Sequence, residues 1–165
     1  MKNAAYALLA VAALALGILA LVPASNAPPS DEALIRNLAE HRAVLDRLIA
    51  MIREDKGLER VDDDWTRPDD PASIGVTPER IAEYRRLLAE AGVTRGFYSF
   101  NDATTITFMA YAFGLSISGC SKGYIFTDGT PEDLVDEPLD KFHGVSKILV
   151  RRAIGNGWYL EFDSS

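Results

Sequence analysis

The chain has 165 residues, of which 48% are apolar and 25% charged, so it is long enough for one globular domain besides an N-terminal segment. Its formal net charge of −7 opposes contact with a phosphate backbone and makes nucleic acid an unexpected partner. With one cysteine, Cys120, and two histidines, the sequence excludes an intrachain disulfide and a multi-cysteine zinc site, and we expect neither a cofactor nor a metal.

An apolar segment begins the chain. The nineteen residues Ala4–Val22 carry no charge. As a helix they would extend about 28 Å, close to the roughly 30 Å hydrocarbon core of a bilayer. Lys2 precedes the segment, whereas Asp31 and Glu32 are the first charged residues after it. This asymmetry predicts that the N-terminus stays in the cytoplasm and the rest of the chain lies outside it.

Residues 1–24 are therefore interpreted as either a cleaved signal peptide or a single-span membrane anchor. Two small-x-small sites favour cleavage, Val22-Pro23-Ala24 and Ser25-Asn26-Ala27, although Pro28 would hinder the second. The length of the apolar run favours an anchor, because it exceeds the usual signal peptide and just reaches a membrane span. Burial within a soluble domain is disfavoured because the segment has no polar face. In both cases we expect a periplasmic or membrane-anchored domain outside the cytoplasm.

Residues 25–30 are predicted to be a short proline-rich linker, followed by a single domain over 31–165. Ser30 is a suitable helix cap, and the two acids after it complement the helix dipole. Apolar side chains then recur at helical spacing as far as Ile52, with Gly57 as the expected end. His41 lies on this apolar stripe, which predicts a core histidine.

The prolines and aspartates of residues 62–76 predict a loop. Thr77 and Pro78 then have the residue types of a cap and a first helical position, so a second helix is expected to run to Gly92.

From residue 93 the pattern changes to strand-like alternation. Five strands are predicted, at 95–100, 104–113, 115–128, 146–154 and 158–163. Trp158, Leu160 and Phe162 alternate with polar residues and should lie on one buried face. The expected fold class is α+β: an N-terminal hydrophobic helix, then two helices packed on one face of a five-stranded antiparallel meander.

Three sequence blocks resemble a family of small exported bacterial proteins of unknown function. They are DDWTRPDDPASIGVTPERIAEYRRLLAEAGVTRGFY at 63–98, SGCSKGYIF at 118–126 and GNGWYLEFD at 155–163. The shared patterns are TRPDDP, SGxSKGY and a GNxWYLEFD-like block. The resemblance implies membership and export, but no activity, cofactor or catalytic residue. Related chains often have serine at the position of Cys120, which weakens any role for the thiol.

The segment around Cys120 does not match a known catalytic motif. Gly114 and Gly119 have the spacing of a phosphate-binding loop, but Cys120 occupies the lysine position and a strand follows instead of a helix. A cysteine–histidine site would need a histidine brought close by the fold. We favour a bulge or close backbone approach at Gly119 and Gly123, beside a surface that could line a groove. Cys120, Lys122 and Tyr124 share one face of this strand and are candidate ligand-facing residues.

Trp65 is the fourth candidate ligand-facing residue, because it lies among acids and next to arginine. Packing of its loop onto the domain is the favoured interpretation, with ligand contact as the alternative. The aspartates at 62–64 and 69–70 lack the spacing of a calcium loop and are interpreted as a solvated surface that can pair with Arg60 and Arg67. Arg151 and Arg152 must point to opposite sides of their strand, where salt bridges explain them.

No coherent acid–base or metal set emerges, and we therefore assign no catalytic, cofactor-binding or metal-binding residue. The favoured function is a non-enzymatic binding or accessory domain of the bacterial envelope, whose partner is another envelope protein or a small ligand. One alternative is a small envelope enzyme with its site on the exposed sheet face. Another is an acidic immunity-type inhibitor of a basic partner, motivated by charge alone. The membrane would be a further partner through residues 4–22 if these are not cleaved.

Overall fold

The computed structural model describes residues 27–100, 103–115 and 118–165. The predicted N-terminal hydrophobic helix and its membrane or signal role lie outside these residues. Among the described helices, none combines the length and the apolar character needed to cross a bilayer.

In the described part of the chain, three α-helices precede most of the sheet: α2 (Asp31–Glu40), α3 (Arg42–Glu54) and α4 (Pro78–Glu90). Ser30 and Thr77 cap α2 and α4, each accepting a hydrogen bond from the backbone amide three residues later. The prediction of two helices was wrong because the first one is interrupted at His41, whose φ of −112° and ψ of 18° leave the helical region. The apolar spacing continues across this break, so periodicity alone did not reveal it.

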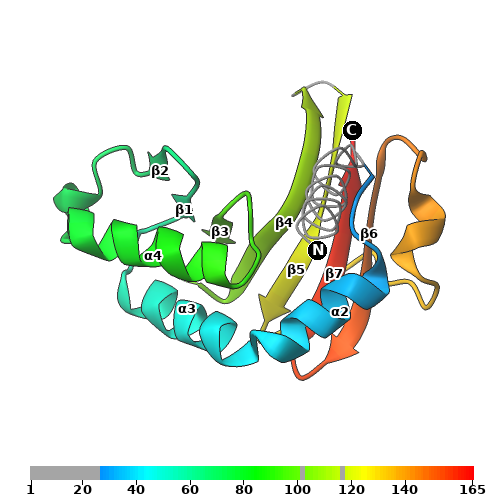
Figure 1. Ribbon diagram of the computed structural model, residues 1–165, viewed down its shortest axis with the longest axis horizontal. Coiled ribbons are helices and arrows are strands. Elements are labelled where there is room, and N and C mark those ends of the chain that lie inside the picture. The colour runs from blue at the N-terminus through cyan, green and yellow to red at the C-terminus, as the bar shows by residue number, and fades with distance from the viewer. Residues whose placement is uncertain (1–26, 101–102, 116–117) are drawn as a thin grey trace, which may run out of the picture.

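Seven strands form one antiparallel sheet in the order β2-β1-β3-β4-β5-β7-β6 (Figure 1). Their bounds are β1 (Arg60–Val61), β2 (Thr66–Arg67), β3 (Phe97–Phe100), β4 (Thr105–Leu115), β5 (Ser118–Thr127), β6 (Ile148–Gly155) and β7 (Trp158–Ser164). Two short 3-10 helices, η1 (Pro71–Ile74) and η2 (Leu139–Phe142), complete the described elements.

The domain is α+β, but the predicted five-stranded meander is wrong in two respects. The two-residue strands β1 and β2 form a hairpin at a position predicted to be loop, because two residues are too few to produce an alternating pattern. In addition, β7 lies between β5 and β6, so the last strand is not at the sheet edge. Which strand occupies the edge depends on long-range pairing that local sequence does not encode.

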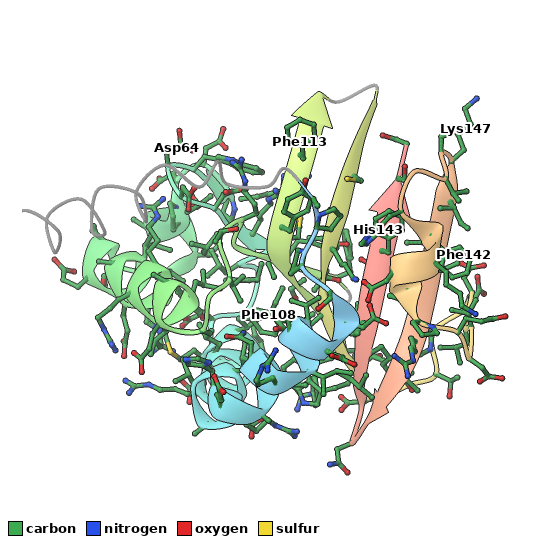
Figure 2. The ribbon with its side chains drawn as sticks, turned by 45° about the vertical axis from the view of Figure 1, so that its right-hand side comes forward. Asp64, Phe108, Phe113, Phe142, His143 and Lys147 are labelled. Carbon is green, nitrogen blue, oxygen red and sulfur yellow. The ribbon has the colours of Figure 1, made fainter. Side chains whose placement is uncertain are left out.

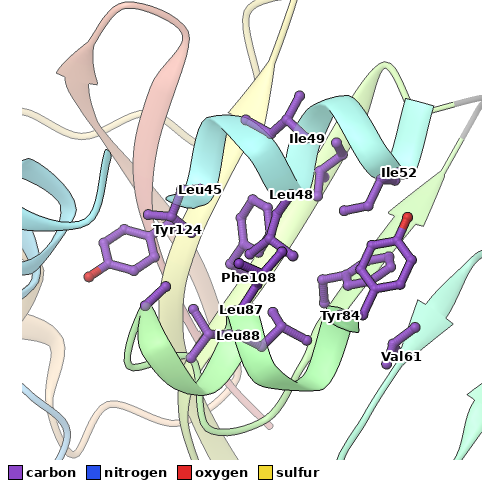
Figure 3. Close-up of a cluster of buried hydrophobic side chains, with 14 of the residues drawn as sticks. Leu45, Leu48, Ile49, Ile52, Val61, Tyr84, Leu87, Leu88, Phe108 and Tyr124 are labelled. Carbon is purple, nitrogen blue, oxygen red and sulfur yellow. The ribbon is translucent and has the colours of Figure 1, made fainter. Parts of the chain in front are cut away.

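The helices pack against one face of the sheet and form the core with it. Figure 3 shows α3 and α4 side by side over side chains from β4 and β5, with Leu48, Tyr84 and Phe108 at the centre. Trp158, Leu160 and Phe162 are buried on this same face, which confirms the predicted alternation of β7. The opposite face, with Tyr98, Thr107 and other residues of the alternate register, is called here the helix-free face.

Gly123 marks a close approach between two backbones. A Cβ atom at this position would lie 2.1 Å from the carbonyl oxygen of Phe108 on β4. The register of β4 against β5 shifts between Met109 and Tyr111, directly opposite Gly123. The irregularity that the glycines predicted is therefore present, but the extra residue belongs to β4.

Gly123→Ala is expected to destabilise the domain by about 2 kcal/mol or more, because the new methyl group must displace backbone atoms. Chemical denaturation of the full-length protein measures the loss. Gly129→Ala is the matched control, since its Cβ would meet only the Thr127 hydroxyl at 3.9 Å. Equal stability of the two variants would contradict this account of Gly123.

Candidate functional site

A buried ionic cluster joins α2, β5, η2 and β6 on the helix-covered face. Lys122 is only 1% exposed, and its Nζ lies 2.7 Å from Asp31 Oδ1 and 2.6 Å from Asp140 Oδ1. Arg152 donates to Asp31 Oδ2 at 3.1 Å, and the Leu139 amide donates to the same oxygen at 2.8 Å. Every charged member has an oppositely charged partner, and Lys122 and Asp31 are buried, so the cluster joins these elements at its buried centre.

Asp140 also accepts hydrogen bonds from the Asp31 amide, at 3.2 Å to each carboxylate oxygen. Partial burial raises the pKa of Asp140, but the hydrogen bonds from Lys122 and the Asp31 amide outweigh burial and hold this pKa below its usual value. His143 Nε2 lies 3.7 Å from the same carboxylate. Figure 2 places His143 with Phe142 at the end of η2, and the His143 ring packs on Phe162 of β7.

A second charged group lies on the helix-free face. Arg151 Nε donates to Glu161 Oε2 at 2.8 Å, and the Tyr98 hydroxyl donates to Glu161 Oε1 at 3.2 Å. Burial raises the pKa of Glu161 despite these partners, and burial also raises the pKa of Tyr98 to about 12. Since Tyr98 on β3 reaches across two intervening strands to β7, the helix-free face must curve inward at this point.

The β1–β2 hairpin forms the border of a cleft on the same face. This arginine–aromatic cleft has a volume of about 310 Å³. Its lining residues are Glu59, Arg60, Trp65, Arg67, Tyr98 and Phe100. The Arg60 guanidinium lies 4.5 Å from the centre of the Trp65 ring and pairs with Asp62 at 2.8 Å, as the sequence suggested. Trp65 remains 41% exposed and Phe100 59% exposed, so two large rings face solvent at one site.

The four candidate ligand-facing residues lie in three places. Trp65 is in the arginine–aromatic cleft. Cys120 is half-buried and lines a separate hollow of about 430 Å³ that also touches Arg60. Lys122 and Tyr124 are buried beneath the helices, where the Tyr124 hydroxyl donates to the Leu34 carbonyl at 3.0 Å. The structure therefore does not bring these four residues together.

Of the six residues that line the cleft, the sequence singled out only Trp65 as a ligand-facing candidate. Arg60 and Arg67 were considered only as partners for acids, the two aromatic residues Tyr98 and Phe100 only as parts of a strand, and Glu59 not at all. The alternation within β3 indicates that Tyr98 and Phe100 share a face. Their position opposite Arg60 requires the β1–β3 pairing, which the sequence did not indicate.

No family model, no curated protein and no solved structure matches the chain.

Lys122→Met is expected to destabilise the domain by about 3–5 kcal/mol, because it leaves buried Asp31 without its main cationic partner. Adding Asp31→Asn should recover part of the loss, since it removes the uncompensated charge but keeps a side-chain oxygen for the Leu139 amide. Urea denaturation of the two variants and of Asp31→Asn alone completes the cycle. If the losses in unfolding free energy of Lys122→Met and Asp31→Asn simply add up in the double variant, the two groups are not coupled.

Asp140→Asn is expected to change how stability depends on pH. Because folding lowers the pKa of Asp140, its carboxylate stabilises the native state above the unfolded value of about 4, and this contribution disappears as pH falls through the folded pKa. The difference in unfolding free energy between wild type and Asp140→Asn should therefore be larger at pH 7 than at pH 3. Asp46→Asn, which alters an exposed pair with Arg42, is the control and should show little such change. A pH-independent difference for Asp140→Asn would contradict the assignment.

Proposed function

We propose that this protein is a non-enzymatic binding domain of the bacterial envelope, which presents the helix-free face of its sheet to a partner. The observation that carries this proposal is the exposure of Trp65 and Phe100 beside two arginines in one cleft. Exposed aromatic and arginine side chains are the residue types that contribute most to binding surfaces.

The buried ionisable groups support binding in preference to catalysis. Lys122 is held by Asp31 and Asp140, and Glu161 is held by Arg151 and Tyr98. A general acid or base must instead reach a substrate directly or through one water molecule. Each carboxylate oxygen of Glu161 already accepts a hydrogen bond, one from Arg151 and one from Tyr98. This favours a structural role for Glu161, in which it shapes the helix-free face.

The location outside the cytoplasm is supported by the uncharged segment at residues 4–22 and by the positive charge that precedes it. The described domain begins beside the buried ionic cluster, because Asp31 is the first residue of α2 and a member of that cluster. If residues 1–24 are retained as an anchor and not cleaved as a signal peptide, the linker at 25–30 would connect that anchor to a fixed point on the domain.

A photocrosslinking amino acid placed at Phe100 in the full-length chain tests this function in intact cells. We expect a discrete adduct at position 100 that falls several-fold when Trp65→Ala is added, because Trp65 lines the same cleft as Phe100. Position 86 on α4 is the control, since Arg86 is exposed and its side chain pairs with Glu90 alone among the described residues. Its crosslinker should give no such adduct.

The same cells also test the compartment. Protease added to spheroplasts should digest the domain while a cytoplasmic marker survives. Identical adducts at positions 86 and 100 would refute binding through the cleft, and protection of the domain would refute the envelope location.

A further inference from the structure

We propose that the arginine–aromatic cleft binds a small ligand in which a carboxylate or phosphate group is attached to a single ring with an apolar face. This inference rests on the proposed binding function and specifies its ligand by chemical class. It is carried by two independent features of the cleft, the arrangement of its charges and the arrangement of its aromatic rings.

The charges of the cleft come from two arginines at directly opposed positions of the β1–β2 hairpin. Arg60 on β1 and Arg67 on β2 are direct register partners in an antiparallel pair. Like charges in this position repel and destabilise the hairpin. Asp62 compensates Arg60 only, whereas the Arg67 side chain makes no ion pair or hydrogen bond within the described residues. An oxyanion bound between the two guanidinium groups would supply the missing compensation.

Arginine suits this role because its planar donors form paired hydrogen bonds to carboxylate and phosphate groups. Arg60 Nε is buried and has no hydrogen-bond partner among the described residues, so this guanidinium retains unused donor capacity. Among the described residues that line the cleft, Glu59 is the one acid. Its carboxylate reduces the net positive charge of the site. The site therefore favours a ligand with a single small anionic group over a ligand that carries several negative charges.

The aromatic residues supply flat apolar surfaces on the same cleft. Arg60 covers one face of Trp65, and the ring is otherwise largely open. The Tyr98 and Phe100 rings meet edge to face at 5.3 Å, which holds Phe100 in position although it is mostly exposed. A ring that stacks on these surfaces would cover apolar area that is now in water.

The size of the cleft restricts the ligand further. Small-molecule sites usually have volumes of about 300–1,000 Å³, and this cleft of about 310 Å³ is at the lower limit. One ring with its anionic group is therefore the appropriate size. Acidic sugars, sugar phosphates and aromatic carboxylates all have this chemistry, and matched pairs of probes distinguish them.

Calorimetric titration of the full-length protein in detergent with three pairs of probes tests the proposal. Each pair shares a ring and differs in the anion: galacturonate and galactose, glucose 6-phosphate and glucose, benzoate and benzyl alcohol. At least one anionic probe should bind about tenfold more tightly than its neutral partner, as expected for a charge-assisted contact. The pair that shows the difference identifies the source of the ring.

The variants Arg67→Ala and Trp65→Ala should each weaken that binding about tenfold, and Arg67→Lys should restore only part of it because lysine lacks the planar fork. Arg86→Ala is the control of equal charge change and should bind like wild type. Unfolding temperatures within error of wild type would show that the variants fold.

The proposal is overturned if all three anions fail to bind at 10 mM, on the order of the weakest small-ligand affinities. It is also overturned if neutral and anionic probes bind equally, or if folded Arg67→Ala binds as wild type does. A crosslink at position 100 that persists alongside any of these results would leave the binding function standing and remove only the ligand class.

Discussion

The desolvated charge of Lys122 is the constraint on which the rest of the structure depends. A buried ammonium group is stable only when oppositely charged groups surround it, and here these come from α2 and η2. The start of α2 and the 3-10 helix η2 must therefore both reach Lys122 on β5, and Arg152 of β6 joins the cluster through Asp31. This requirement fixes α2 across the sheet and brings Asp31, near the start of the domain, against its centre.

The helices and the ionic cluster cover one face of the sheet, so the helix-free face is formed by the side chains of the strands alone. Its centre is closed by the contact of Tyr98 with Glu161 and by the pairing of Glu161 with Arg151. These contacts satisfy the buried carboxylate and curve the sheet, so the surface open to a partner lies toward the β1–β2 edge. The division between the face that holds the helices and the proposed binding face thus follows from where the buried charges are neutralised.

The sequence predicted elements that depend on local signals and missed those that depend on pairing. Caps at Ser30 and Thr77 and the alternation of β7 were readable because each involves neighbours in the chain. The short hairpin and the insertion of β7 beside β5 are determined by distant pairing. The break at His41 left no trace in the apolar spacing, which continues across it. For the candidate site, Trp65 was identifiable as unusual, but the opposition of Arg60 and Arg67 appears only when the hairpin register is known.

That hairpin is poorly suited to a purely structural role. It contains two residue pairs, and Arg60 faces Arg67 in one of them, whereas the other places buried Val61 beside Thr66. Arg85 Nε on α4 donates a hydrogen bond to the Asp62 carbonyl at 3.0 Å, which links the turn of the hairpin to this helix. Since α4 and the Val61 side chain already fix the hairpin, a neutral pair at positions 60 and 67 would serve stability better than two like charges. The hairpin instead holds Trp65 against one arginine and leaves the other without a counter-ion among the described residues, an arrangement whose cost a bound anion would offset.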